Sequence, residues 1–221
     1  MKGKLLLVGL LAAAVLAGCG GKKDVSTPAA APQQQGSNTP APAANAAEGK
    51  YTIVQAESNA QYSVKEVFLA DSLNNTAVGK TNVITGDLVL SKGVIQPSKI
   101  VVDVTKLTSD KPQRDNKIKT TGLETDKFKT AEFSITGVEG TPPVIGATEA
   151  SFKLKGKLLV HGVEKDVVWD AKWKLDGDKV KLDATIHFTM ADFNITPPNI
   201  LNMIKVDENV QLDVSLVAKK G

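Results

Sequence analysis

From Tyr51 to the end of the chain, apolar and polar residues alternate with a period of two. In the segment 180–188, Val, Leu, Ala, Ile and Phe occupy every second position, with Lys, Asp, Thr and His between them. This period is that of β-strands with one dry face and one wet face. We therefore expect about eight strands, near 51–57, 61–70, 78–91, 98–107, 131–139, 150–160, 166–175 with 179–190, and 209–219.

Short turn sequences between these strands indicate antiparallel pairing. Asp176-Gly177-Asp178 predicts a hairpin, and the segment from His161 to Lys165 predicts another tight reversal. Many antiparallel strands with one dry side must enclose a core, and closing a barrel removes their exposed edges. We therefore predict an all-β fold, an antiparallel eight-stranded barrel, with a sandwich of two sheets as the alternative. Such a barrel is just wide enough to be filled or to hold one slender ligand.

The alternation stops between Lys111 and Thr130. This long connection is polar but contains apolar residues of its own, which is typical of a lid or a binding loop. Asp115 is a candidate N-cap for a short helix that contains Ile118. We therefore expect a short helical lid segment here.

The first 19 residues follow the pattern of a bacterial export signal. Lys2 and Lys4 precede an apolar run, 5–16, that is too short to span a bilayer. The run ends in Leu16-Ala17-Gly18-Cys19, which resembles a bacterial lipobox, and Cys19 is the only cysteine. In such signals the chain is cut before the cysteine, which then carries a diacylglycerol and usually an acyl group such as palmitate. We expect lipidation at Cys19 and an extracytoplasmic, membrane-anchored protein; an ordinary secretory signal is the alternative.

The composition changes abruptly after the signal. From Gly20 to Gly49, Pro, Ala, Gln, Ser and Asn dominate and large apolar residues are nearly absent. Such a segment buries too little surface to offset the entropy lost on ordering. We therefore divide the chain into a signal peptide (1–18), a disordered tether (19–49) and one barrel domain (50–221).

Charge and composition argue against several classes of function. The precursor has a net charge of +3, part of which leaves with the signal, and it contains no basic block suited to nucleic acid. With Cys19 committed to lipid, no disulfide is expected. His161 and His187 lack partners at metal-ligand spacing. The sequence contains no nucleotide-binding or nucleophile motif, so we expect no catalytic residues and no metal or cofactor, apart from a bound lipid.

The domain resembles the YceI-like family, whose members are extracytoplasmic lipocalin-like barrels that bind polyisoprenoid lipids. Three segments carry the resemblance, and the first is the most specific. They are Arg114-Asp115 with Ile118-Lys119, Asp126-Lys127-Phe128 and Ala131-Glu132-Phe133; Leu154 to Leu158 with His161-Gly162-Val163-Glu164-Lys165; and Phe193-Asn194-Ile195. Glu66, Lys117 and Met190 depart from the family's pattern, which has histidine at the first two places and arginine at the third.

The resemblance implies a lipid partner, a quinone or polyprenyl chain held in a cavity for carriage, storage or sensing. A tunnel lined by aromatic and aliphatic side chains suits such a chain. Our candidates for the wall are Phe68, Phe128, Phe133, Trp169, Trp173, Phe188 and Phe193, and plain packing is the alternative for each. Arg114 and Asp115 are expected to fix the lid as a salt-bridged or backbone-bonded pair, and the alternative is that Arg114 meets a phosphate or quinone oxygen of the ligand. A filled structural barrel, or an enzyme acting on isoprenoids, is the alternative function.

Overall fold

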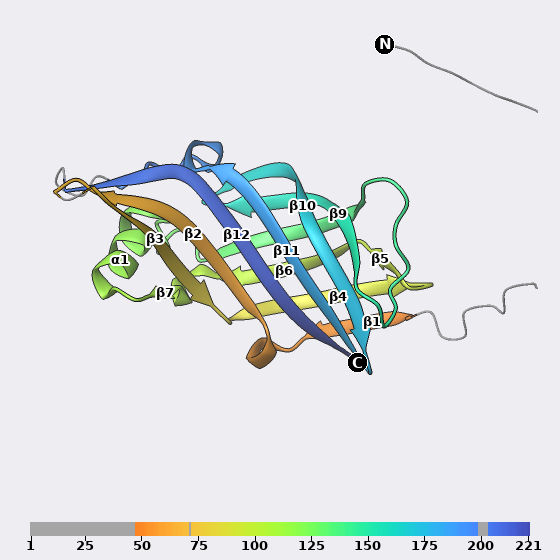
Figure 1. The fold of residues 1–221 in the computed structure, drawn as a ribbon. Coiled ribbons are helices and arrows are strands. Elements are labelled where there is room, and N and C mark those ends of the chain that lie inside the picture. The colour runs from red at the N-terminus through yellow and green to blue at the C-terminus, as the bar shows by residue number, and fades with distance from the viewer. Residues whose placement is uncertain (1–46, 71, 199–202) are drawn as a thin grey trace, which may run out of the picture. The chain divides into compact units, whose positions relative to one another are not determined.

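The computed structural model describes residues 47–70, 72–198 and 203–221, so the predicted signal and most of the predicted tether, including Cys19, lie outside the described residues. The described chain is almost entirely β-structure (Figure 1). Its strands are β1 (Gly49–Ile53), β2 (Asn59–Phe68), β3 (Leu73–Thr81), β4 (Ile84–Ser91), β5 (Val94–Gln96), β6 (Ser98–Asp103), β7 (Thr108–Ser109), β8 (Thr130–Val138), β9 (Ala150–Val160), β10 (Val163–Asp176), β11 (Lys179–Thr189) and β12 (Ile204–Lys220).

Eight of these strands close into an antiparallel barrel, as predicted. The circuit runs β1-β4-β6-β8-β9-β10-β11-β12 and returns to β1, where Tyr51 pairs with Lys220. β2 lies beside the same edge of β12 and carries β3 and then the short β7. Both predicted hairpins are present, because β9 joins β10 through His161-Gly162 and β10 joins β11 through Gly177-Asp178. The structure is therefore not a sandwich.

Several strand limits differ from the prediction. The single strand expected at 78–91 is two strands, β3 and β4, with a corner where the Thr81 hydroxyl accepts a hydrogen bond from the Val83 amide at 3.1 Å. β3 begins at Leu73, in a polar stretch whose composition hides its pairing with β2. β12 begins at Ile204 rather than 209, because a bulge between Val206 and Val210 breaks the alternation that the prediction followed.

Between β7 and β8, short helical turns form the predicted lid. α1 (Pro112–Lys117) continues into a π-helical turn, η3 (Ile118–Gly122). The predicted cap is wrong: the helix begins after Lys111 with no side-chain cap, and Asp115 lies inside it. The Asp115 carboxylate instead accepts hydrogen bonds from the Ser109 amide at 2.8 Å and the Ser109 hydroxyl at 2.6 Å, which ties the helix to β7.

Three further 3-10 turns are η1 (Gln55–Glu57), η2 (Val104–Lys106) and η4 (Met190–Phe193). In the part of the chain that the structure describes, no helix is long and apolar enough to cross a membrane.

Candidate functional site: an apolar cavity at one end of the barrel

One end of the barrel encloses a cavity of about 640 Å³. Its wall consists mainly of aliphatic and aromatic side chains from β2, β6, β8, β9, β11 and β12, and the lid contributes Ile118 and Leu123. The volume lies within the range of about 300–1,000 Å³ that is usual for a site holding one small ligand. This part of the bore is therefore hollow.

The opposite end of the barrel is filled. Trp173, Leu88 and Leu90 are at most 1% exposed there, and no residue of β1, β4 or β5 lies in the cavity wall. The connection between β8 and β9 covers this end: the Ile145 amide donates to the Gly93 carbonyl at 2.8 Å, and the Ile145 side chain is buried. We call the two parts the closed end and the hollow end. The cavity is accordingly a pocket that stops inside the barrel.

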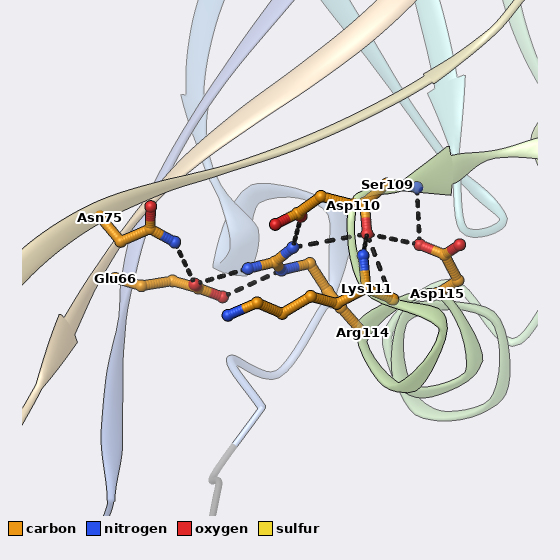
Figure 2. Close-up of polar contacts among 7 residues, drawn as sticks. All are labelled: Glu66, Asn75, Ser109, Asp110, Lys111, Arg114 and Asp115. Atoms are coloured by element: carbon orange, nitrogen blue, oxygen red, sulfur yellow. Dashed lines mark hydrogen bonds and ion pairs between the residues drawn. The ribbon is translucent and has the colours of Figure 1, made fainter.

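A buried ion pair joins the lid to the barrel at the hollow end (Figure 2). Arg114 of α1 donates from Nη2 to Glu66 Oε2 at 2.9 Å and from Nε to Glu66 Oε1 at 3.3 Å. The side chains of Arg114 and Glu66 are only 10% and 6% exposed. Asn75 of β3 donates a further bond to Glu66, and Asp110 pairs with the Arg114 Nη1. The single arginine is thus held by two carboxylates.

This arrangement fixes the charge state of the guanidinium. Burial alone would lower the pKa of Arg114, but the hydrogen bonds and charges of Glu66 and Asp110 raise it overall. Of the two roles expected for Arg114, the structure therefore shows the ion pair that fixes the lid. Contact with a ligand's polar group remains a prediction, although Arg114 and Glu66 both lie in the cavity wall.

Tyr62 places a polar group in the cavity wall that sequence reasoning missed. Its ring lies against Gly79 of β3, so closely that a Cβ there would meet the ring at 2.2 Å. The hydroxyl is buried and has no hydrogen-bond partner among the described residues. Burial raises the pKa of Tyr62, against a smaller lowering by Arg114, so the phenol keeps its proton. Tyr62 therefore adds a neutral phenol to the cavity wall, with its hydroxyl oxygen covered by neighbouring atoms.

Four of the eight candidate residues lie in the cavity wall. Arg114 is one, and the others are Phe133 of β8, Trp169 of β10 and Phe188 of β11. Phe133 and Trp169 pack together with their ring centroids 5.5 Å apart. Trp169 is 3% exposed, yet its indole Nε1 has no hydrogen-bond partner in the described chain. These residues are where a ligand in the cavity would touch aromatic surface.

The other four candidates do not line the cavity. Trp173 packs against Phe152 in the closed end, and Phe193 packs edge-on against Phe188 behind the wall. Phe68 lies beyond the cavity, with Lys111 Nζ 5.4 Å from its ring centroid. Phe128, expected to be part of the lid, packs instead against His161 and over Gly162. Alternation placed most of these rings on inward faces but could not say what lies opposite them.

The two histidines make contacts that hold neighbouring elements together. The His161 ring lies 2.9 Å from Glu124 Oε2 and 3.2 Å from the Phe193 carbonyl, which ties the β9–β10 turn to the lid and to η4. His187 is exposed and bonds Gln211 on the neighbouring strand. In the residues that the structure describes, no group of three His, Cys, Asp or Glu side chains is arranged to hold a metal ion.

The places where the sequence departs from the family pattern meet at this site. Glu66, Lys117 and Met190 all lie in the cavity wall. Met190 is buried against Val64 and Val210, where it extends the apolar surface. The region therefore combines an apolar wall with a neutralised ion pair, the amines of Lys111 and Lys117, and a buried phenol.

Comparison with known proteins agrees with this architecture. Residues 51–218 match the model of the YceI-like domain. The chain belongs to the YceI-like family. No curated protein sequence matches the chain.

Three solved structures share the fold. Burkholderia cenocepacia BcnA has a TM-score of 0.61 at 14% identity, over 76% of this chain and 99% of that one. A polyisoprenoid binding domain from Saccharophagus degradans, implicated in plant cell wall breakdown, has a TM-score of 0.61 at 13% identity, over 77% and 98%. A YCEI protein from Campylobacter jejuni has a TM-score of 0.52 at 15% identity, over 62% and 81%.

Proposed function

We propose that the protein binds one isoprenoid-type lipid in its cavity and shelters it from water. The supporting observation is the cavity itself: about 640 Å³ of apolar space inside a barrel whose other end is solid. Each methylene buried there contributes about 0.8 kcal/mol, so a few isoprene units give strong retention. The polyisoprenoid binding domain among the structural neighbours favours this class of ligand.

We also propose that the protein is anchored by an acylated Cys19 and works outside the cytoplasm. The lipobox-like Leu16-Ala17-Gly18-Cys19 and the Pro/Ala-rich segment after it support this location. Two or more acyl chains give stable anchoring, whereas one alone gives only marginal binding. The protein would then carry or store its lipid close to a membrane.

The Glu66–Arg114 pair favours a ligand that brings no charge beside it. Glu66 and Asp110 already occupy the Arg114 guanidinium, and the Glu66 carboxylate would repel a phosphate brought beside it. The Tyr62 phenol keeps its proton and adds no charge to this wall. Beside this pair a quinone or an isoprenoid alcohol fits better than a prenyl phosphate does, whereas the Lys111 and Lys117 amines of the same wall would attract a phosphate.

Organic extraction and native mass spectrometry of gently purified protein test the binding directly. We expect one isoprenoid-type molecule per chain. Ala184→Leu is the matched variant, because Ala184 lies in the cavity wall and a larger side chain there takes up the space. Protein that is empty after purification from several hosts, and that takes up no added quinone, would indicate a structural barrel instead.

Substitution of Glu66 tests the selection of the head group. Glu66→Gln keeps the shape but removes a negative charge, which at about 4 Å and an effective dielectric constant of about 20 is worth roughly 4 kcal/mol. We expect binding of a prenyl phosphate, measured against binding of the matching prenol, to improve by about tenfold or more. Asp110→Asn is the control, because Asp110 is exposed and outside the cavity wall. Unchanged preference in Glu66→Gln would refute the selection.

A further inference from the structure

The end of the sheet beyond the cavity carries an exposed apolar surface. Leu69, Leu73 and Met203 are 51%, 61% and 62% exposed, and the Leu69 amide donates to the Met203 carbonyl at 2.8 Å. We call these three residues the apolar tip. Among the described residues, the other large apolar side chains that are exposed are Val144 and Val168, on other parts of the barrel. Single exposed apolar residues are ordinary, but a cluster at one end indicates an interaction surface.

The apolar tip continues a row of side chains that begins inside the cavity. Strand register places Ile204 beside Phe68, and Phe68 beside Leu73, so the three share the cavity-facing side of the sheet. Ile204 is itself part of the cavity wall. Leu69 directly follows β2 and Met203 directly precedes β12, so both lie at the end of this row. Figure 1 shows β2, β3 and the start of β12 converging beside α1 at this end.

We propose that the apolar tip inserts into the surface of a lipid bilayer, where the protein exchanges its bound lipid. An isoprenoid that left the cavity through water would expose its whole chain. A row of apolar side chains from the cavity wall to the exposed apolar tip allows the chain to pass without that exposure. The exposed apolar tip alone supports the proposed insertion, whereas the proposed exchange of lipid rests on the proposed function.

The length of chain before the barrel fits this orientation. β12 runs the length of the molecule, from Ile204 beside Phe68 to Lys220 beside Tyr51 at the closed end. Its 17 residues span roughly 56 Å at about 3.3 Å each. The barrel starts at that closed end, away from the tip. The 27 residues 20–46 reach, when extended, about 90 Å. An anchor at Cys19 thus leaves the tip free to touch the same bilayer.

A fluorescent probe on the tip tests insertion. The full-length protein, held on phosphatidylcholine vesicles by its own anchor, carries nitrobenzoxadiazole on Met203→Cys; the control carries it on Val144→Cys, which is similarly exposed at 57%. Unsubstituted protein shows whether Cys19 also takes the label. We expect a blue shift and quenching by brominated lipid at position 203 only. Equal signals at both positions, or none at 203, would overturn the proposal.

A second measurement separates insertion from ligand binding. Leu69→Asp with Met203→Asp should slow the passage of a fluorescent quinone from vesicles to the protein by about tenfold or more. The amount bound at equilibrium in detergent should not change, and Val144→Asp should leave the rate as it was. Failure of every variant to bind the quinone would refute the proposed function while the probe still reports on insertion. A dimer that Leu69→Asp dissociates, with a silent probe, would instead make the tip a contact between copies.

Discussion

Two tryptophans on β10 mark the difference between the two ends of the barrel. Trp169 and Trp173 are four residues apart on the same face, and they are 3% and 1% exposed. Trp173 packs in the closed end against Phe152, with ring centroids 4.9 Å apart. Trp169 packs against Phe133, but it also borders the cavity. Equal burial from water therefore conceals opposite surroundings, because one ring meets side chains on every side and the other does not.

The difference arises from the size of the inward residues and from what covers each end. In the closed end, Tyr51, Leu88, Leu90 and Ile145 supply large buried side chains. In the hollow end, alanines occupy several inward positions, and the short helices of the lid replace strands. The alanines of the cavity wall are Ala60, Ala77, Ala131 and Ala184. Residue volume and the lid together therefore leave the space, although the closed end also buries a small residue, Ala218.

The largest effect should come from removing the two indoles in turn. Trp173→Ala creates a cavity in a packed core, and we expect it to lower the free energy of unfolding by about 3–5 kcal/mol. Trp169→Ala removes a side chain that already borders empty space, so its loss should be smaller, about 1–3 kcal/mol. Urea denaturation of the lipid-free protein measures both.

Trp169→Ala should reduce lipid retention more than Trp173→Ala does. Trp169→Ala alters the wall of the cavity, whereas Trp173→Ala lies outside it. Equal losses of stability, together with equal retention of lipid, would show that the two ends are packed alike.

Adding volume should produce a smaller difference. Ala218 of β12 is fully buried in the closed end beside Ile53, and Ala184 of β11 lies in the cavity wall. Ala218→Leu overpacks the core and should lower the free energy of unfolding by about 1–3 kcal/mol. Ala184→Leu should leave stability nearly unchanged or raise it, since it fills a void, while it abolishes uptake of lipid. Equal destabilisation by both substitutions would indicate that the two ends are packed alike.

The sequence was sufficient to predict the barrel but not its contents. Strict alternation and two short turns identified most strands and both hairpins. Alternation says only that a side chain faces inward, so Trp173 and Trp169 were equally good candidates for the cavity wall. The pair between Glu66 and Arg114 joins residues 48 positions apart, and neither residue carries a local signal of the other. Tyr62 was missed for a similar reason: its free hydroxyl depends on the close approach of its ring to Gly79.

The smallest effect concerns acid, and it should appear first at the hollow end. Asp192 of η4 accepts hydrogen bonds from Lys165 Nζ and the Thr189 amide, each at 2.8 Å, and these contacts, that of Lys165 first, hold its pKa well below the ordinary value. A depressed pKa means that the carboxylate stabilises the fold fully above the ordinary aspartate pKa of about 3.9, and that this contribution is lost as pH falls further.

Hydrogen exchange of the backbone amides should detect this loss. Between pH 6 and pH 2, protection in 189–195 should fall before protection in 171–175, because the buried side chains of 171–175 are held mainly by packing. Carboxylates with a lowered pKa also lie near that end, Asp87 beside Lys50 and Asp176 beside Lys181, but they pair at its surface. Asp192→Asn should lack the extra protection at pH 6 already, and its difference from the unsubstituted protein should shrink as the pH falls below about 4. If acid loosened β10 in the closed end first, the closed end would depend on charge as much as the hollow end does. The two ends would then differ in packing alone.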